Sequence, residues 1–175
     1  MKSHNEYRDQ FHTQSKDMGW WANSHLGHIE PVKMMLIVSE VSEADTADGP
    51  DDKLPQYPGR AVELADAAIR LYDLLGWYKK DIPSELPHSS LVALLGSEAQ
   101  HLLVNNEVSA AMEADRKGLK QLAADHLTVA LAFVWSIAMV NHFDLVEIME
   151  AKIEFNRNRP DHQPEQRSAT NGKAY

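Results

Sequence analysis

Apolar positions recur with a helical period over most of this chain, and strand patterns are nearly absent. We find no sustained period-two alternation and no Asn-Gly or Asp-Gly hairpin turn between β-branched residues. One clear apolar stripe runs through Val62, Ala65, Ala68, Leu71 and Leu75. The pattern therefore predicts an all-α fold, a bundle of helices joined by loops.

Breaker residues divide the pattern into successive helical stretches. We expect helices near residues 5–21, 31–47, 60–78, 90–114, 119–141 and 145–158. Pro31 suits the first turn of the second helix, and Gly49-Pro50 lies in the loop that ends it. We expect one helical domain over residues 1–160, with 90–141 as inserted helices, and a flexible polar tail over 161–175.

Composition narrows the possible functions. The 175 residues are 43% hydrophobic and 25% charged, which is enough for one domain with a core. The formal net charge of −9 argues against a nucleic-acid partner, which needs a basic surface. There is no cysteine, so disulfides, thiolate metal sites and cysteine nucleophiles are excluded. The chemistry must use oxygen and nitrogen groups.

Two segments bear on location. The first 14 residues are polar and charged, without the apolar core of an export signal, so we expect a cytoplasmic protein. The longest apolar run, 127–140, is too short to cross a bilayer as a helix. We therefore expect a buried core helix there and no membrane partner.

Two pairs of carboxylates stand at helical spacing. Glu40 and Glu43 share one helix face with Leu36 and Ile37, so they point toward the apolar side. Glu63 and Asp66 repeat the spacing in the next helix. Burying like charges is costly without a cation, although acidic pairs at this spacing also occur on solvated surfaces.

If the two helices pack antiparallel, all four carboxylates meet. Such a cluster, with neither cysteine nor a required histidine, suits a hard cation, Mg²⁺ or Mn²⁺. A cation of this kind can bridge phosphate oxygens and activate water. The sequence thus predicts a metal site at Glu40, Glu43, Glu63 and Asp66.

Three segments, in this order, resemble the signatures of MazG-like nucleoside triphosphate pyrophosphohydrolases. They are Leu-Ile-Val-Ser-Glu-Val-Ser-Glu-Ala at 36–44, Glu-Leu-Ala-Asp-Ala-Ala-Ile-Arg-Leu-Tyr-Asp at 63–73, and Lys-Ile-Glu-Phe-Asn-Arg-Asn-Arg-Pro at 152–160. The resemblance implies the all-α pyrophosphatase fold and Mg²⁺-dependent hydrolysis of nucleoside triphosphates, above all deoxynucleotides, to monophosphate and pyrophosphate. It also implies a homodimer or homotetramer.

The resemblance implies roles for individual residues. Glu40, Glu43, Glu63 and Asp66 would be the catalytic metal ligands. Lys152, Asn156 and Arg159, which share one helix face, would contact phosphates and sugar; alternatively, Lys152 and Arg159 are exposed basic residues at a helix end.

Three more candidates lie upstream. Lys33, two turns before Glu40, would reach a phosphate or form a salt bridge. The segment containing Trp20 and Trp21 resembles one in phage-type members, where an aromatic residue helps form the base pocket; otherwise the two rings are packing anchors.

The chain also departs from the family pattern. Ser39 stands where many members have a further glutamate, and the segment 90–141 is inserted before the last signature. Glu98 lies 58 positions after Glu40 in a similar context, so the insert is either a degenerate second copy or a chance likeness of amphipathic helices. We expect it to complete the bundle and to wall the pocket.

Two other functions remain as alternatives. Glu98-Ala-Gln-His101 is a Glu-x-x-His pair of the type found in di-iron carboxylate bundles, which require two such pairs, and this chain has one. A regulatory protein that binds nucleotide and metal without turnover would keep the same motifs.

Overall fold

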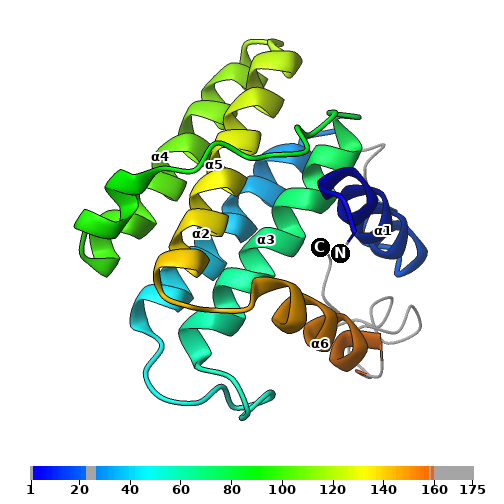
Figure 1. Cartoon of the computed structure of the whole chain (residues 1–175). Helices are drawn as coiled ribbons and strands as arrows, with labels where there is room; N and C mark the ends of the chain where they lie inside the picture. Colours follow the sequence, from blue (N-terminus) through cyan, green and yellow to red (C-terminus); the bar gives the residue numbers. More distant parts are fainter. Residues whose placement is uncertain (1, 23–26, 158, 160–175) are drawn as a thin grey trace.

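The computed structural model describes residues 2–22, 27–157 and 159, and this part of the chain forms a helical bundle (Figure 1). The α-helices are α1 (His4–Asp17), α2 (Ile29–Thr46), α3 (Gly59–Trp77), α4 (Ser97–Arg116), α5 (Lys120–Val140) and α6 (Leu145–Arg157). A short 3₁₀ helix, η2 (Ser90–Leu94), precedes α4. Within the described residues there is no strand, so the predicted all-α class is confirmed.

Most predicted helices match the observed ones within a few residues, but the one expected over 90–114 is wrong. It is divided into η2 and α4, because Gly96 is extended (φ −68°, ψ 165°) and forms the N-cap of α4. The glycine interrupts a sequence that is apolar enough to continue as one helix. The predicted tail, 161–175, lies outside the described residues.

Helix α3 is the centre of the bundle (Figure 1). It packs against α1, α2, α5 and α6, and its apolar side chains, such as Leu64, Leu71 and Leu75, are fully buried. A helix surrounded in this way can carry polar groups only where they meet partners or a cavity. Its few acidic residues are therefore informative about the site.

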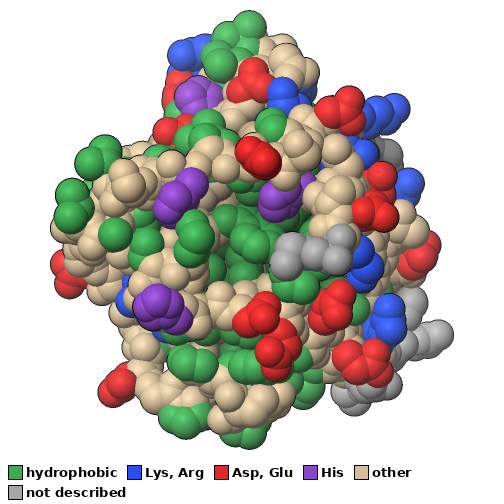
Figure 2. Space-filling view, viewed as in Figure 1, with side chains coloured by type: hydrophobic (Ala, Val, Ile, Leu, Met, Phe, Trp, Pro, Cys, Tyr) green, Lys and Arg blue, Asp and Glu red, His purple; other side chains and the backbone are tan. Residues whose placement is uncertain are grey.

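The inserted helices α4 and α5 form a hairpin that packs on the α2–α3 hairpin, α4 against α2 and α5 against α3. By length and composition, α5 would pass as a membrane span, but 61% of the apolar window is buried inside the protein. The core helix of a globular bundle has the same character. On the face in Figure 2, apolar side chains reach the surface around this hairpin, whose exposed members include Leu102 and Met139.

The loop between α2 and α3 is closed by its own hydrogen bonds. Gly59 N donates to Gly49 O (2.9 Å), and Asp51 N donates to Tyr57 O (2.9 Å). Oδ1 of Asp51 accepts from the backbone N–H groups of Lys53 and Leu54, and Leu54 is buried. The loop is thus a folded connection that fixes how α2 and α3 lie next to each other.

Helix α1 approaches α3 closely at Gly76. A Cβ atom on Gly76 would lie 2.5 Å from Cβ of His12, a distance that side chains do not tolerate. This glycine lets α1 pack directly on the last turns of α3. Since Phe11 and Gln14 of α1 line the cavity described below, the approach also sets the position of one cavity wall.

Candidate functional site

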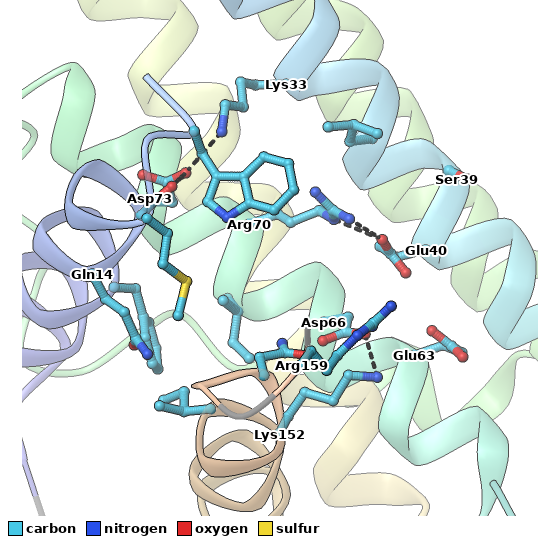
Figure 3. Close-up of a pocket in the computed structure, with 18 of the residues that line it drawn as sticks. Gln14, Lys33, Ser39, Glu40, Glu63, Asp66, Arg70, Asp73, Lys152 and Arg159 are labelled. Atoms are coloured by element: carbon cyan, nitrogen blue, oxygen red, sulfur yellow. Dashed lines mark hydrogen bonds and ion pairs between the residues drawn. The ribbon is translucent and has the colours of Figure 1, made fainter. Parts of the chain in front are cut away.

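A cavity of about 450 Å³ lies beside α2 and α3, between α1 and α6 (Figure 3). Its charged lining consists of five carboxylates (Glu40, Glu43, Glu63, Asp66, Asp73) and five cations (Lys33, Lys53, Arg70, Lys152, Arg159). The rest of the lining is largely apolar, including Phe11, Met18, Trp20, Leu36 and Ile69. The lining is therefore balanced in charge, with both signs close together.

Antiparallel packing of α2 and α3 brings the predicted acids together. Oxygen atoms of Glu40, Glu43 and Glu63 all lie within 4.8 Å of one another. Glu40 is buried, Glu63 is half-buried and Glu43 is exposed, so only part of the first pair faces the interior as expected. No other group of three or more acidic or histidine side chains this close exists in the described parts of the chain.

Asp66 lines the same cavity but is not a member of the close group. Its Oδ2 lies 2.6 Å from Nζ of Lys152, which is 2% exposed. The expected cluster of four therefore takes the form of three neighbouring carboxylates and a fourth already paired with a buried lysine. Figure 3 shows this lysine reaching from α6 to α3.

The crowding of negative charge changes the acid–base properties of the group. Burial and the neighbouring Asp66 carboxylate raise the pKa of Glu63 to about 7. Burial also raises the pKa of Glu40, although the Arg70 guanidinium opposes this. Because both pKa values are raised, the charged forms of Glu40 and Glu63 are destabilised in the folded protein. A bound cation would stabilise these charged forms.

The donor set fits a hard divalent cation. It consists of carboxylate oxygens from neighbouring helices, with no histidine or thiolate, on the wall of a cavity that has room for a ligand. Glu40, Glu43 and Glu63 are the residues that would hold such an ion directly. Asp66 could join them if Lys152 moved to another anion.

Asp73 organises the end of the cavity formed by α1 and the start of α2. Its Oδ1 accepts from Nε1 of Trp21 (2.8 Å) and its Oδ2 accepts from Oγ of Ser15 (2.8 Å). Nδ1 of His12 lies 2.9 Å away, and Nζ of Lys33 donates to Oδ2 at 3.3 Å. One buried carboxylate thus ties three segments of the chain together.

The same contacts bear on the alternatives for Lys33, which also lines the cavity, and for the two tryptophans. Lys33 is buried and forms the salt bridge with Asp73, with its ammonium 4.6 Å from the Trp21 ring centre. Trp21 is buried and stacked on Trp77 (centroids 4.6 Å apart), so it is a packing anchor and does not line the cavity. Trp20 does line it and stays the candidate for stacking on a base.

The three residues predicted from the last motif all line the cavity. Lys152 is buried, so the alternative of an exposed basic residue is wrong for it. Asn156 has a buried Oδ1 atom without a hydrogen-bond partner, and the Arg159 guanidinium lies 5.8 Å from the Phe155 ring centre. Their predicted contacts with phosphates and sugar stay predictions.

The insert does not take part in the cavity. Among the described residues that line it, none comes from 90–141, so the expectation that the insert walls the pocket is wrong. Glu98 is exposed, and Nδ1 of His101 lies 2.9 Å from Oδ1 of Asp45, away from the three clustered glutamates. Among the described residues, neither Glu98 nor His101 belongs to a close group of three or more acidic or histidine side chains, which a di-iron site would require.

Sequence reasoning gave no role to Arg70 or Asp73, although both line the cavity. The sequence does contain a pattern that points to both residues. Spacings of three and four place four charged residues on one face of α3: Glu63, Asp66, Arg70 and Asp73. Their partners could not be read from the sequence, since Glu40 and Trp21 come from other segments.

No protein-family model matches this chain, and neither a curated protein nor a solved structure matches it. The resemblance to MazG-like enzymes therefore rests on the three motifs alone and stays a prediction.

Proposed function

We propose that this protein is a pyrophosphohydrolase that uses Mg²⁺ or Mn²⁺ to hydrolyse (deoxy)nucleoside triphosphates to monophosphate and pyrophosphate. The observation that carries the proposal is the group of three carboxylates, with oxygens within 4.8 Å, in a cavity that also holds five cationic side chains. Carboxylates alone would suit a cation. The adjacent lysines and arginines suit a ligand with several negative charges.

The lining of the cavity extends along α2 and α3, from Glu43 and Glu63 to Lys33 and Asp73. Three pairs of side chains connect the two helices along the cavity: Glu43 with Glu63, Glu40 with Arg70, and Lys33 with Asp73. Their residue numbers fall along α2 as they rise along α3, because the helices are antiparallel. Ten residues separate Lys33 from Glu43, which corresponds to about 15 Å of helix. With a cation held by the acidic group, such a cavity suits a ligand that has an anionic end at the cation and a flat, partly apolar end near Trp20.

Different residues of the cavity would bind the cation, the phosphates and the sugar. Glu40, Glu43 and Glu63 would hold the cation, which when bound would polarise phosphate oxygens and activate a water molecule. Arg159, Lys53 and Lys152 line the same cavity and would bind phosphate oxygens. Asn156, with its unpartnered buried oxygen, can accept a hydrogen bond from a sugar hydroxyl.

The test is a panel of canonical and modified nucleoside triphosphates with Mg²⁺, with separation of the products. We expect nucleoside monophosphate and pyrophosphate in equal amounts, and none of either with EDTA. Orthophosphate with nucleoside diphosphate as the products would contradict the proposal. Nucleotide binding without any turnover would instead identify a non-catalytic binding protein.

A further inference from the structure

Arg70 holds one of the proposed cation ligands in an internal ion pair. Its Nε and Nη2 atoms lie 2.7 Å and 2.6 Å from the same oxygen of Glu40, Oε1 (Figure 3). Both donors lie on Oε1, so the guanidinium offsets much of the negative charge that Glu40 would otherwise offer to a metal. While this pair exists, the guanidinium competes directly with a cation for Glu40.

The other two carboxylates of the group differ in this respect. Within the described residues, neither Glu43 nor Glu63 forms a salt bridge, and Glu43 only accepts a hydrogen bond from Oγ of Ser39 (3.1 Å). The Arg70 guanidinium therefore pairs with Glu40, the most buried of the three carboxylates. Desolvation makes an unpaired charge most costly there, which explains why the pair forms.

The Arg70 guanidinium is accessible enough to exchange Glu40 for another anion. The Arg70 side chain is 36% exposed, whereas that of Glu40 is 9% exposed, and Arg70 lines the cavity itself. Arginine can exchange a carboxylate for a phosphate oxygen with little change in hydrogen-bond geometry. The lining carries as many carboxylates as cations, so a divalent cation bound alone leaves excess positive charge, and a triphosphate bound alone leaves excess negative charge.

Building on the proposed function, we infer that Arg70 is an exchangeable counter-ion that pairs with Glu40 in the free protein and with a phosphate oxygen when cation and triphosphate bind together. Neither ligand alone compensates for breaking the pair. Arg70 therefore makes the binding of cation and triphosphate cooperative, so that neither accumulates in the site without the other.

The test measures binding rather than turnover. Mn²⁺ affinity is measured on the metal-free protein, and the affinity of inorganic tripolyphosphate is measured in EDTA and in saturating Mn²⁺. In the parent protein, tripolyphosphate should bind more tightly with Mn²⁺ than in EDTA. Arg70→Gln should bind Mn²⁺ alone roughly threefold to tenfold more tightly, and should lose a similar factor of the Mn²⁺-dependent gain in tripolyphosphate affinity.

Glu40→Gln is a second variant that keeps Arg70 and removes its partner. It should bind tripolyphosphate in EDTA more tightly than the parent, because the guanidinium is no longer held. Arg116→Gln, which removes an exposed arginine paired with Glu113 on α4, is the matched control and should change neither affinity.

The outcomes separate the two proposals. If the parent shows the cooperative gain and both Arg70→Gln and Glu40→Gln behave like it, the exchange is wrong and the proposed function stands. If the parent binds neither Mn²⁺ nor tripolyphosphate, the proposed function fails and the exchange fails with it.

Discussion

The ammonium nitrogen of Lys152 lies 2.6 Å from Oδ2 of Asp66, and both side chains are turned away from bulk solvent. The pair joins α6 to α3 at the cavity, so the last motif of the sequence meets one of the two acidic helices through an ionic contact. Burial lowers the pKa of Lys152, but the carboxylates of Asp66, Glu63 and Asp51 outweigh it and raise the pKa overall. Lys152 is therefore charged in the folded protein.

Replacement of Lys152 should destabilise the protein more than replacement of its partner. Lys152→Met keeps the apolar stem but leaves Asp66 unpaired beside Glu63, and should lower the free energy of unfolding by about 2–4 kcal/mol. The double variant Lys152→Met/Asp66→Asn should recover most of that loss. Urea denaturation of both variants and of Asp66→Asn completes the cycle, and simple additivity would show that the pair contributes nothing.

Neutralising the acidic group should abolish activity without unfolding the protein. Glu40→Gln, Glu43→Gln and Asp66→Asn should each remove most pyrophosphohydrolase activity and leave helical content nearly unchanged by circular dichroism. For Glu43, which is exposed and has no cation partner among the described residues, metal-free stability should stay level or rise because repulsion is relieved. Unfolding of all three variants, with unchanged activity per folded molecule, would assign the acids a structural role.

The metal-free protein should lose stability as the pH rises toward neutrality. The pKa of Glu63 is about 7 in the folded protein and about 4.5 for an ordinary glutamate, so between these values the folded state binds more protons than the unfolded chain. That contribution is fully present below about pH 4.5 and disappears as the pH passes about 7. Denaturation midpoints measured in EDTA across this range should fall in the parent, whereas Glu63→Gln should show a flatter profile.

Gly76→Ala should displace α1 and damage the cavity wall. The new Cβ would meet His12 Cβ at 2.5 Å, so α1 must shift, and we expect a loss of about 1–3 kcal/mol in stability together with weaker nucleotide binding. Gly96→Ala is the matched control, since no atom lies within 4 Å of its Cβ position. Equal stability of both variants would mean that α1 does not depend on this close approach.

The insert should matter for stability and not for chemistry. Leu127 of α5 is fully buried, so Leu127→Ala should cost about 2–5 kcal/mol. Glu98 is exposed and outside the cavity, so Glu98→Gln should leave kcat within a few-fold of the parent. Loss of turnover in a folded Glu98→Gln protein would reopen the Glu-x-x-His interpretation.

Helical periodicity and breakers were sufficient to predict most of the helices, because those signals are local, but they missed the division of 90–114 at Gly96. They also put Glu40 with Glu43, and Glu63 with Asp66, on shared helix faces. Antiparallel packing of the two helices brought three of the four acids together, whereas Asp66 pairs with Lys152. Pairings between distant segments could not be predicted. Whether Lys33 meets a ligand or Asp73, and whether Trp20 or Trp21 faces the cavity, depends on how α1 and the start of α2 dock on α3.

The hydrogen-bonded loop between α2 and α3 has a thermodynamic consequence for the site. Because Gly49, Asp51 and Leu54 are fixed by contacts within the loop, the relative height of the two helices is set when the chain folds. The conformational entropy lost in gathering Glu40, Glu43 and Glu63 is therefore a cost of folding and not of binding. A ligand meets an assembled acidic group, and a longer, floppier loop would weaken cation affinity even if every carboxylate were kept.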